Sequence, residues 1–303
     1  MATLIRRVPW TVQPQTPVGI DWGNPVARGL VFCAVPFGNT AIDLVTGVVG
    51  TSNNAAISQS VHSVGTGLSR RGEGRAITGT TTTTDVITWP VSTKRGGTMI
   101  AEATILCLGG GNSSNNGLYQ FAGNCDGSSS GDGFSLGIDN YSIQPNRGAI
   151  TNGRYGNQKS GVFYSATGVL GDPPCLRTHF FGYSATANGV SGNYFAGGNA
   201  TAYSGQNANG TTTTNRQATI LAPSITGVAG TRNSYVLLAL FWDRAISPAE
   251  YARIYDNPWQ LFTPQSRIIY TADAVAGGIP TLSAAGMSSI GATYATPYAT
   301  LTF

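Results

Sequence analysis

Charged side chains are the scarcest feature of this sequence. Asp, Glu, Lys and Arg make up 10% of its 303 residues and leave a net charge of +4, whereas an average soluble domain carries about 25% charged residues. The basic cluster Arg70, Arg71 and Arg75 is too small for the wide basic stripe that nucleic-acid binding requires. We therefore expect no nucleic-acid partner, and a polar, uncharged surface suited to packing in an assembly or to neutral ligands.

Paired cysteines and long apolar runs are also missing. The four cysteines are far apart and form no C-x-x-C pair for zinc or redox chemistry, so we expect free thiols, with Cys33 and Cys107 in the core. The longest apolar run, 235–242, is less than half of the ~20 residues that a membrane-spanning helix needs. The first residues lack the apolar core of a signal peptide, which predicts synthesis in the cytosol and no membrane span.

Residues suited to hydrolytic chemistry are few. The glutamates are Glu73, Glu102 and Glu250, and none has the E-x-D-x-x-E spacing that brings two carboxylates together on a glycosidase strand. A G-x-S-x-G match at 127–131 lies in a turn-rich segment rather than between a strand and a helix. We expect a protein that is not an enzyme and has no catalytic residues, with glycan hydrolysis as the least favoured function.

Short strands separated by Gly, Asn and Ser turns dominate the middle of the chain. Many strands of this kind predict an all-β sandwich or barrel. In the segment 98–108, alternate positions are polar at the start, which predicts a strand with one exposed face. The predicted strands are 30–35, 85–91, 98–108, 117–123, 133–138, 161–166, 178–185 and 234–242.

The sequence predicts a short helix near residues 248–256. Ser247 is a suitable N-cap, Pro248 fits the first helical position, and Glu250 completes a capping box. The apolar side chains that follow fall on one helical face, and an Asn-Pro pair ends the run.

A Gly- and Asn-rich segment at 184–210 is a candidate ligand site. Its composition predicts a long surface loop or hairpin, on which Tyr194, Phe195 and Tyr203 form a stacking platform for a neutral glycan. The alternative is a loop that packs on a neighbouring subunit.

Calcium is the one cofactor for which the sequence offers ligands. Asp126, Asp132 and Asp139 can supply oxygen atoms, but they do not follow the helix-loop-helix calcium consensus. The alternative is ordinary turn chemistry, because Gly-Asp pairs are common in turns.

Both ends of the chain are predicted to mediate assembly. Residues 1–29 contain four prolines and two tryptophans, which predicts an extended arm. Residues 274–303 carry no charged side chain and end in an alternating pattern, which predicts an edge strand or a strand that pairs with a neighbouring subunit. The expected assembly contacts are Trp10, Trp22, Tyr294, Tyr298, Leu301 and Phe303.

The order of segments carries a family resemblance. The first strand is followed by DLVTG at 43–47 and GRAITG at 74–79, and the last long strand runs into FWDRAISPAEYARIYDNPWQLF at 241–262. This order resembles the laminin-G-like (concanavalin A-like) jelly-roll modules of tailed-bacteriophage virions. Their W-N-R-A-L-S-x-x-E-I segment is similar to Trp242–Ser247 and Glu250 here.

The resemblance implies an antiparallel jelly-roll β-sandwich over residues 30–265, preceded by the arm 1–29 and followed by an extension at 266–303. Together with the uncharged C-terminal extension and the weakly charged surface, it predicts a structural virion protein, a head-decoration or other particle-surface protein, assembled in the host bacterial cytoplasm. The alternative is a tail-associated adhesin that binds a receptor glycan. The expected partners are capsid or tail subunits, further copies of the chain and a host-surface glycan.

Overall fold

Antiparallel β-strands make up most of the part of this protein that the structure describes. The computed structural model describes residues 13–14, 18–53, 56–60, 74–78, 86–92, 103–111, 118–123, 133–139, 150–155, 161–164, 178–186, 191–203, 217–221, 234–264, 270–273 and 281–284. The chain divides into two units, residues 1–263 and 264–303. The second unit contains a hairpin of β19 (Tyr270–Asp273) and β20 (Thr281–Ala284).

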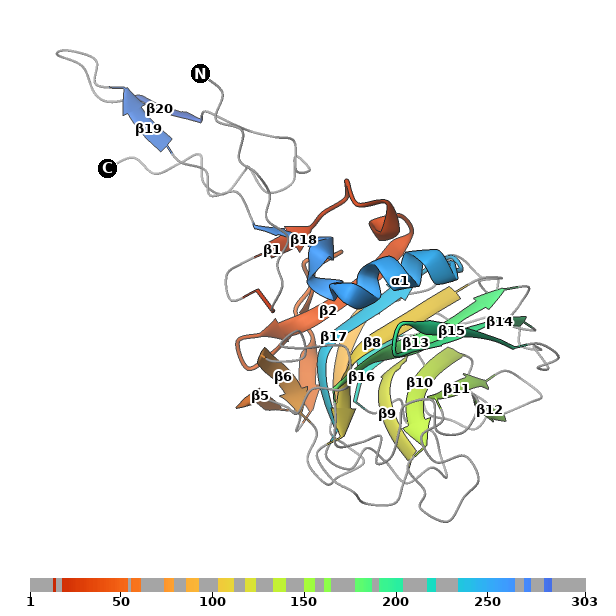
Figure 1. Ribbon diagram of the computed structural model, residues 1–303. Helices are drawn as coiled ribbons and strands as arrows, with labels where there is room; N and C mark the ends of the chain where they lie inside the picture. The colour runs from red at the N-terminus through yellow and green to blue at the C-terminus, as the bar shows by residue number, and fades with distance from the viewer. Residues whose placement is uncertain are drawn as a thin grey trace. The chain divides into compact units, whose positions relative to one another are not determined.

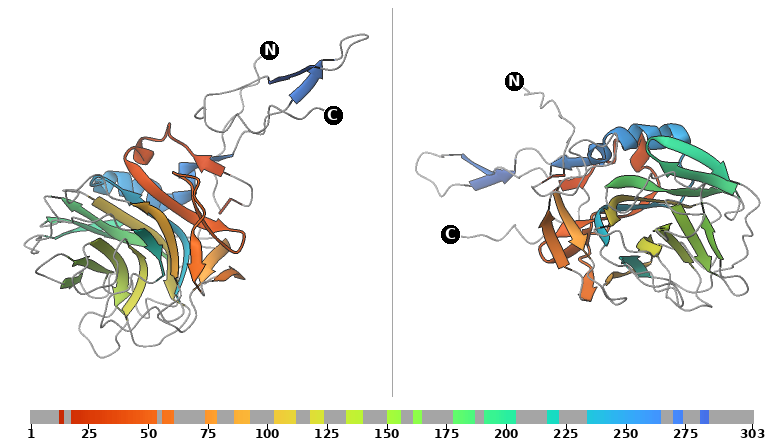
Figure 2. Two further views of the ribbon diagram at one scale, coloured as in Figure 1. Left: turned by 180° about the vertical axis from the view of Figure 1, so that it is seen from behind. Right: turned by 60° about the horizontal axis from the view of Figure 1, so that its bottom comes forward.

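Two large sheets form the first unit, and their described pairings are antiparallel (Figures 1 and 2). The seven-stranded sheet has the order β12 (Gly161–Tyr164), β11 (Ile150–Tyr155), β10 (Gly133–Asp139), β9 (Leu118–Gly123), β16 (Gln217–Ile220), β7 (Val86–Ser92), β4 (Thr51–Asn53). The nine-stranded sheet has the order β15 (Asn199–Tyr203), β14 (Ser191–Ala196), β13 (His179–Thr186), β8 (Ala103–Gly111), β17 (Ser234–Trp242), β2 (Leu30–Phe37), β3 (Thr40–Asp43). In addition, β6 (Gly74–Thr78) pairs with β17, and β5 (Ala56–Ser60) pairs with β6.

The sandwich predicted from the sequence is confirmed. Each of the eight predicted strands is present, as β2, β7, β8, β9, β10, β12, β13 and β17. The first core fills the space between the two sheets, where large rings meet at their edges. The ring centroids of Phe32 and Trp89 lie 5.0 Å apart and those of Phe121 and Phe181 lie 5.2 Å apart, both in T-shaped arrangements.

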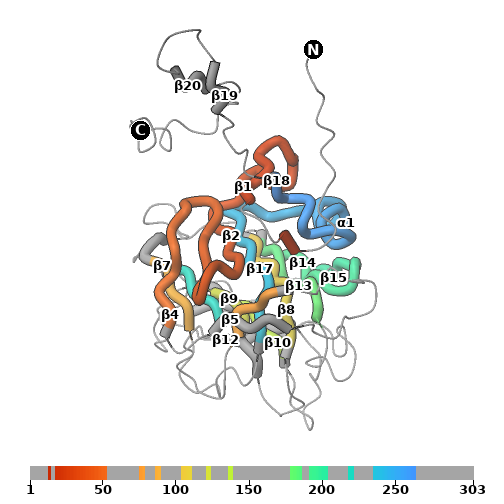
Figure 3. The backbone as a smooth tube through the Cα atoms, turned by 90° about the vertical axis from the view of Figure 1, so that its left-hand side faces the viewer, coloured from red at the N-terminus to blue at the C-terminus, as the bar shows by residue number. Residues whose placement is uncertain are grey.

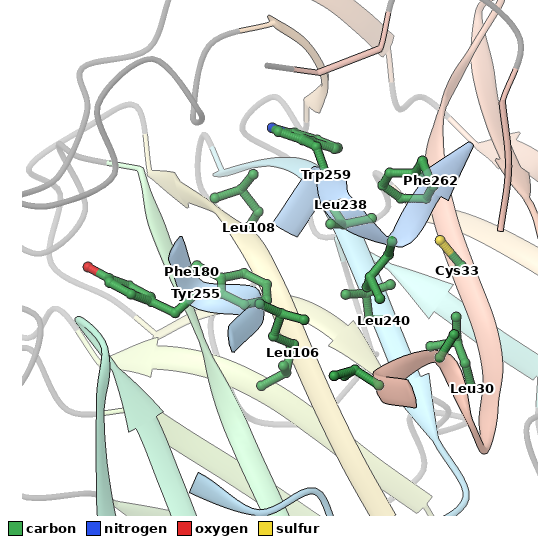
Figure 4. Close-up of a cluster of buried hydrophobic side chains, with 14 of the residues drawn as sticks. Leu30, Cys33, Leu106, Leu108, Phe180, Leu238, Leu240, Tyr255, Trp259 and Phe262 are labelled. Atoms are coloured by element: carbon green, nitrogen blue, oxygen red, sulfur yellow. The ribbon is translucent and has the colours of Figure 1, made fainter. Parts of the chain in front are cut away.

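A second core covers the outer face of the nine-stranded sheet. The helix α1 (Pro248–Asp256), the 3-10 turn η5 (Pro258–Leu261) and the strand pair β1 (Val18–Ile20) and β18 (Phe262–Pro264) contribute to it. Figure 3 shows β1, β18 and α1 at the same end of the sandwich. Figure 4 shows apolar side chains of this layer, among them Leu106, Leu108, Phe180, Leu238, Leu240, Tyr255, Trp259 and Phe262.

The expectation that β8 has one exposed face is wrong, because the second core covers its outer side. We expected a half-exposed strand, but Ile105 and Cys107 face the first core while Leu106 and Leu108 face the second. The polar Thr104 is fully buried as well. Both faces are covered because the nine-stranded sheet is the middle layer of three.

The expectation of an extended N-terminal arm is also wrong in part. Residues 18–29, expected within an extended arm, pack on the sandwich: Val26 and Ala27 of the 3-10 turn η1 (Pro25–Ala27) are buried. The Trp242 indole N–H donates to the Val26 carbonyl at 2.8 Å, and the Asp243 N–H donates to the Gly29 carbonyl at 2.9 Å. Most of the residues before 18 lie outside the described part.

The thiols of Cys33 and Cys107 are free and buried, as predicted, and burial raises the pKa of both, with Asp43 adding to the effect at Cys33. Cys125 and Cys175 lie outside the described residues. Among the described elements, no helix is long and apolar enough to cross a membrane.

Candidate functional site

The family-like segment at 242–250 folds into a charged network that anchors α1. The helix begins as predicted, because Ser247 accepts from the Glu250 N–H at 3.2 Å while the Glu250 carboxylate accepts from the Ser247 N–H at 2.8 Å. Arg244 donates to the same carboxylate twice, from Nη2 at 2.6 Å and from Nη1 at 3.1 Å. Such a bidentate pair fixes the carboxylate in one orientation.

Two buried hydroxyls join this segment to the nine-stranded sheet. Thr104 Oγ1 donates to the Arg244 carbonyl at 2.8 Å. The Ile246 N–H lies 3.0 Å from Thr104 Oγ1 and 3.1 Å from Ser184 Oγ. The two hydroxyls also bond to each other at 3.1 Å, so the loop before α1 is held by β8 and β13. The residues of the motif therefore position the helix, and Glu250 is committed to its cap.

The Glu250 network gives a pH-dependent prediction. Partial burial acts to raise the pKa of Glu250, but hydrogen bonds from Arg244 and Ser247 outweigh it and hold that pKa below its usual value. Because the pKa of Glu250 is lower in the folded than in the unfolded state, its ionised carboxylate contributes its full stabilisation at pH values above the unfolded-state pKa of about 4.3. This contribution is lost as the pH falls through the folded-state pKa. We expect Glu250→Gln to lower the free energy of unfolding by about 1 kcal/mol at pH 7.

Urea denaturation of Glu250→Gln at several pH values between 7 and 3 measures this effect. The difference from the parent chain should shrink as the pH falls. Asp256→Asn is the matched control, since Asp256 is exposed at the other end of α1, where a negative charge opposes the helix dipole. A stability difference for Glu250→Gln that stays constant down to pH 3 would contradict the role of its charge.

Two of the three side chains proposed as a glycan platform are buried in the hydrophobic cores. Tyr194 is 3% exposed and belongs to the first core, whereas Phe195 is fully buried in the second. The ring of Phe195 stacks on Tyr251 of α1 at 4.5 Å, and Tyr194 contacts the ring of the half-buried Tyr203 at 4.8 Å. The expectation of an exposed three-ring platform is wrong, because adjacent strand residues point to opposite faces of a sheet that is covered on both sides.

The hairpin that carries these rings forms one edge of the nine-stranded sheet. Strands β14 and β15 pair from Gly192↔Tyr203 to Ala196↔Asn199 around a turn of Gly197 and Gly198. The surface hairpin expected within 184–210 is therefore present at 191–203. The side chains from Asn199 to Ala202 are exposed, and Figure 1 shows β15 at the margin of the sheet near α1.

The predicted assembly residue Trp22 lies on the surface. Its side chain is 58% exposed in the turn that follows β1, where the Asn24 N–H donates to the Asp21 carbonyl at 2.9 Å. An indole ring with this exposure is available for a contact with another molecule. The other five predicted contacts, Trp10, Tyr294, Tyr298, Leu301 and Phe303, lie outside the described residues.

The predicted calcium site stays a prediction, because two of its three expected ligands lie outside the described residues. Asp139 ends β10, whereas Asp126 and Asp132 lie outside the described residues. Within the described part of the chain, no group of three or more His, Cys, Asp and Glu residues could hold a metal ion.

Solved structures share this fold. Trypanosoma rangeli sialidase in complex with sialic acid is similar with a TM-score of 0.51 and 15% sequence identity, over 76% of this chain and 33% of the sialidase chain. The binding domain of Paraclostridial Mosquitocidal Protein 1 is similar with a TM-score of 0.52 and 11% identity, over 76% of this chain and 52% of that one. This chain thus spans about a third and about half of the two proteins. No family model and no curated protein matches it.

These similarities correct one expectation from the sequence. We expected a protein that is not an enzyme, but the structures that share its fold include sialidases. At about 15% identity the likeness shows a shared β-sandwich fold and assigns no activity to this chain.

Proposed function

We propose that this chain is a surface component of a tailed-phage particle, in which the sandwich attaches to other particle proteins. The observation that supports this most is the segment from Trp242 to Glu250. It resembles the closing segment of phage jelly-roll modules, and its residues here join β17, the N-terminal turn η1 and α1 into one end of the sandwich. In this role the chain binds capsid or tail subunits and is located on the particle.

The low charge of the surface supports an assembly role. No Asp, Glu, Lys or Arg occurs between Arg177 and Arg216, a segment that includes β13, β14 and β15. An uncharged surface lacks the electrostatic repulsion that keeps freely diffusing proteins apart. Trp22 adds an exposed aromatic ring of the kind that is enriched at protein interfaces.

Trp22→Ala tests the assembly contact. Because the ring is largely exposed, we expect little change in the melting temperature and an incorporation into particles at least about tenfold lower than that of the parent chain. Phe37→Ala is the matched control. Phe37, the last residue of β2, is 51% exposed and was not predicted to be an assembly contact.

Quantitative mass spectrometry of purified particles from a complemented deletion strain measures incorporation. Equal incorporation of the Trp22→Ala, Phe37→Ala and parent chains would remove Trp22 from the interface. Absence of the parent chain from purified particles would overturn the proposed function itself.

A glycan-binding adhesin on the tail is a second candidate. One observation favours it: the structures that share this fold include a toxin's binding domain and a sialidase bound to sialic acid. Since Tyr194 and Phe195 are buried, any sugar site would use other residues. Binding of the purified chain to a glycan array would support this candidate, and an array without signal would count against it.

A further inference from the structure

The two ends of the main strand order of the nine-stranded sheet, β3 and β15, differ in how their backbone is protected. The outer side of β3 is covered by the segment that follows it, through a bridge between Ile42 and Val49. The Asp43 N–H donates to the Val48 carbonyl at 2.9 Å, and the Gly50 N–H donates to the Ala41 carbonyl at 2.8 Å. At the opposite edge, β15 pairs with β14 and with no other described strand.

The hairpin turn determines which backbone groups of β15 point outwards. Gly197 and Gly198 have φ angles of +56° and +82°, as a two-residue type I′ turn requires. Such a turn makes Ala196 and Asn199 a hydrogen-bonded pair, and the bonding direction alternates along an antiparallel strand. The N–H and C=O groups of Ala200 and Ala202 therefore point away from β14.

The described residues of this edge include none of the charges, prolines or bulges that usually block strand pairing. Natural sheets protect exposed edges with charges, prolines or bulges. The strand β15 has the sequence NATAY, pairs with β14 in a continuous register, and exposes Asn199, Ala200, Thr201 and Ala202. An exposed, regular and uncharged edge is a template for a further strand.

The sequence of β15 identifies the partner that fits. Thr201 is at its centre with an alanine on each side, so the strand is nearly symmetric about this residue. Strand recognition of foreign peptides draws specificity from side-chain pockets, which alanine and threonine do not form. A second copy of the same strand places alanine opposite alanine and brings no like charges together.

We propose that β15 pairs in antiparallel register with β15 of a second copy of this chain, about a two-fold axis at Thr201. In this register Ala200 of each copy lies opposite Ala202 of the other, and their outward N–H and C=O groups form four hydrogen bonds. The two Thr201 residues face each other in the close, non-hydrogen-bonded position. The two nine-stranded sheets become one continuous sheet, whatever the function of the protein.

Sedimentation of the full chain, with variants at Thr201, tests the pairing. The parent chain of 31.4 kDa should approach twice this mass as its concentration rises. Thr201→Lys places two like charges opposite each other and should weaken the dimer at least about tenfold. Thr201→Val keeps the shape without charge and should leave the dimer intact. Unchanged melting temperatures of both variants show that the fold is preserved.

Oxidative cross-linking then tests the register. Opposed Cα atoms at the two-fold axis lie about 4.5 Å apart, within the range of a disulfide, so T201C should cross-link efficiently. A200C is the control, because its Cα atoms lie about 8 Å apart, beyond that range. The parent chain, oxidised in parallel, gives the background of the native cysteines.

Each result decides for or against the pairing. A dimer that Thr201→Lys dissociates and that T201C links preferentially supports the proposal. A chain that is monomeric at all concentrations overturns it, as does a dimer in which A200C and T201C cross-link equally. A monomer whose incorporation into particles falls with Thr201→Lys also overturns it, and assigns the edge to a different particle protein.

Discussion

Replacing Tyr251 by alanine is expected to lower the free energy of unfolding by about 3–5 kcal/mol. The ring is fully buried at the centre of the second core, stacked on Phe195 at 4.5 Å and on Phe180 at 5.8 Å. Its hydroxyl donates to the Phe180 carbonyl at 2.8 Å. The substitution removes the ring that holds α1 on β13 and β14, so chemical denaturation should show a large loss of stability.

Tyr251→Phe separates the ring from its hydroxyl. It keeps the stacked aromatic contacts and loses two hydrogen bonds of the hydroxyl, one to the Phe180 carbonyl and one with the Gly198 backbone, so the expected loss is about 1–2 kcal/mol. Hydrogen exchange gives a second readout, because Tyr251→Ala should reduce amide protection in β14 and β15 as well as in α1. A small stability loss for Tyr251→Ala, close to that of Tyr251→Phe, would show that α1 does not depend on this ring.

Asp43→Ala is expected to destabilise the protein by about 2–4 kcal/mol. Asp43 is fully buried, and its Oδ1 accepts from the Cys33 N–H at 2.8 Å and from the Val45 N–H at 3.1 Å. Its Oδ2 accepts from the Thr46 hydroxyl at 2.6 Å. Alanine leaves a buried N–H of β2 without a partner and releases the DLVTG turn that covers the β3 edge.

Asp43→Asn is the matched variant for this site. Its side-chain oxygen still accepts from the two backbone N–H groups, so we expect a loss of about 1 kcal/mol, well below that of alanine. Thermal denaturation monitored by circular dichroism, with urea titration at 25 °C, measures both variants. Equal losses for alanine and asparagine would indicate that the carboxylate charge, rather than acceptor geometry, stabilises the turn.

Local signals in the sequence predict much of this fold. The cap of α1 is encoded within four residues, Ser247 to Glu250, and these residues make the predicted bonds. The strands follow from apolar runs bounded by turns. In both cases the residues that determine the element lie inside it or next to it, so no knowledge of distant contacts is needed.

Long-range contacts account for what the sequence did not predict. Thr104 looks like an exposed strand residue until β8 is paired with β13 and β17, which brings Ser184 and Arg244 to its hydroxyl. Trp242 and Val26 are 216 positions apart, and their contact draws part of the predicted arm onto the sandwich.

The candidate glycan site failed for a related reason. Gly and Asn around Tyr194 and Phe195 are typical of a loop, and composition alone does not show that a hairpin joins a sheet with two covered faces. Burial of the two rings on opposite faces follows from the pairing of β14 with β13. The exposed edge of β15 likewise becomes visible only once the strand order is known.

Immunogold labelling of purified particles with an antibody against this chain tests the central claim most directly. A component of the particle surface should give gold on most particles of the parent phage and none on particles from a deletion strain. Many labels over the head indicate a decoration protein, whereas labels confined to the tail tip indicate the adhesin. Purified parent particles without label, while the antibody detects the chain in the soluble fraction of the lysate, would contradict the proposed function.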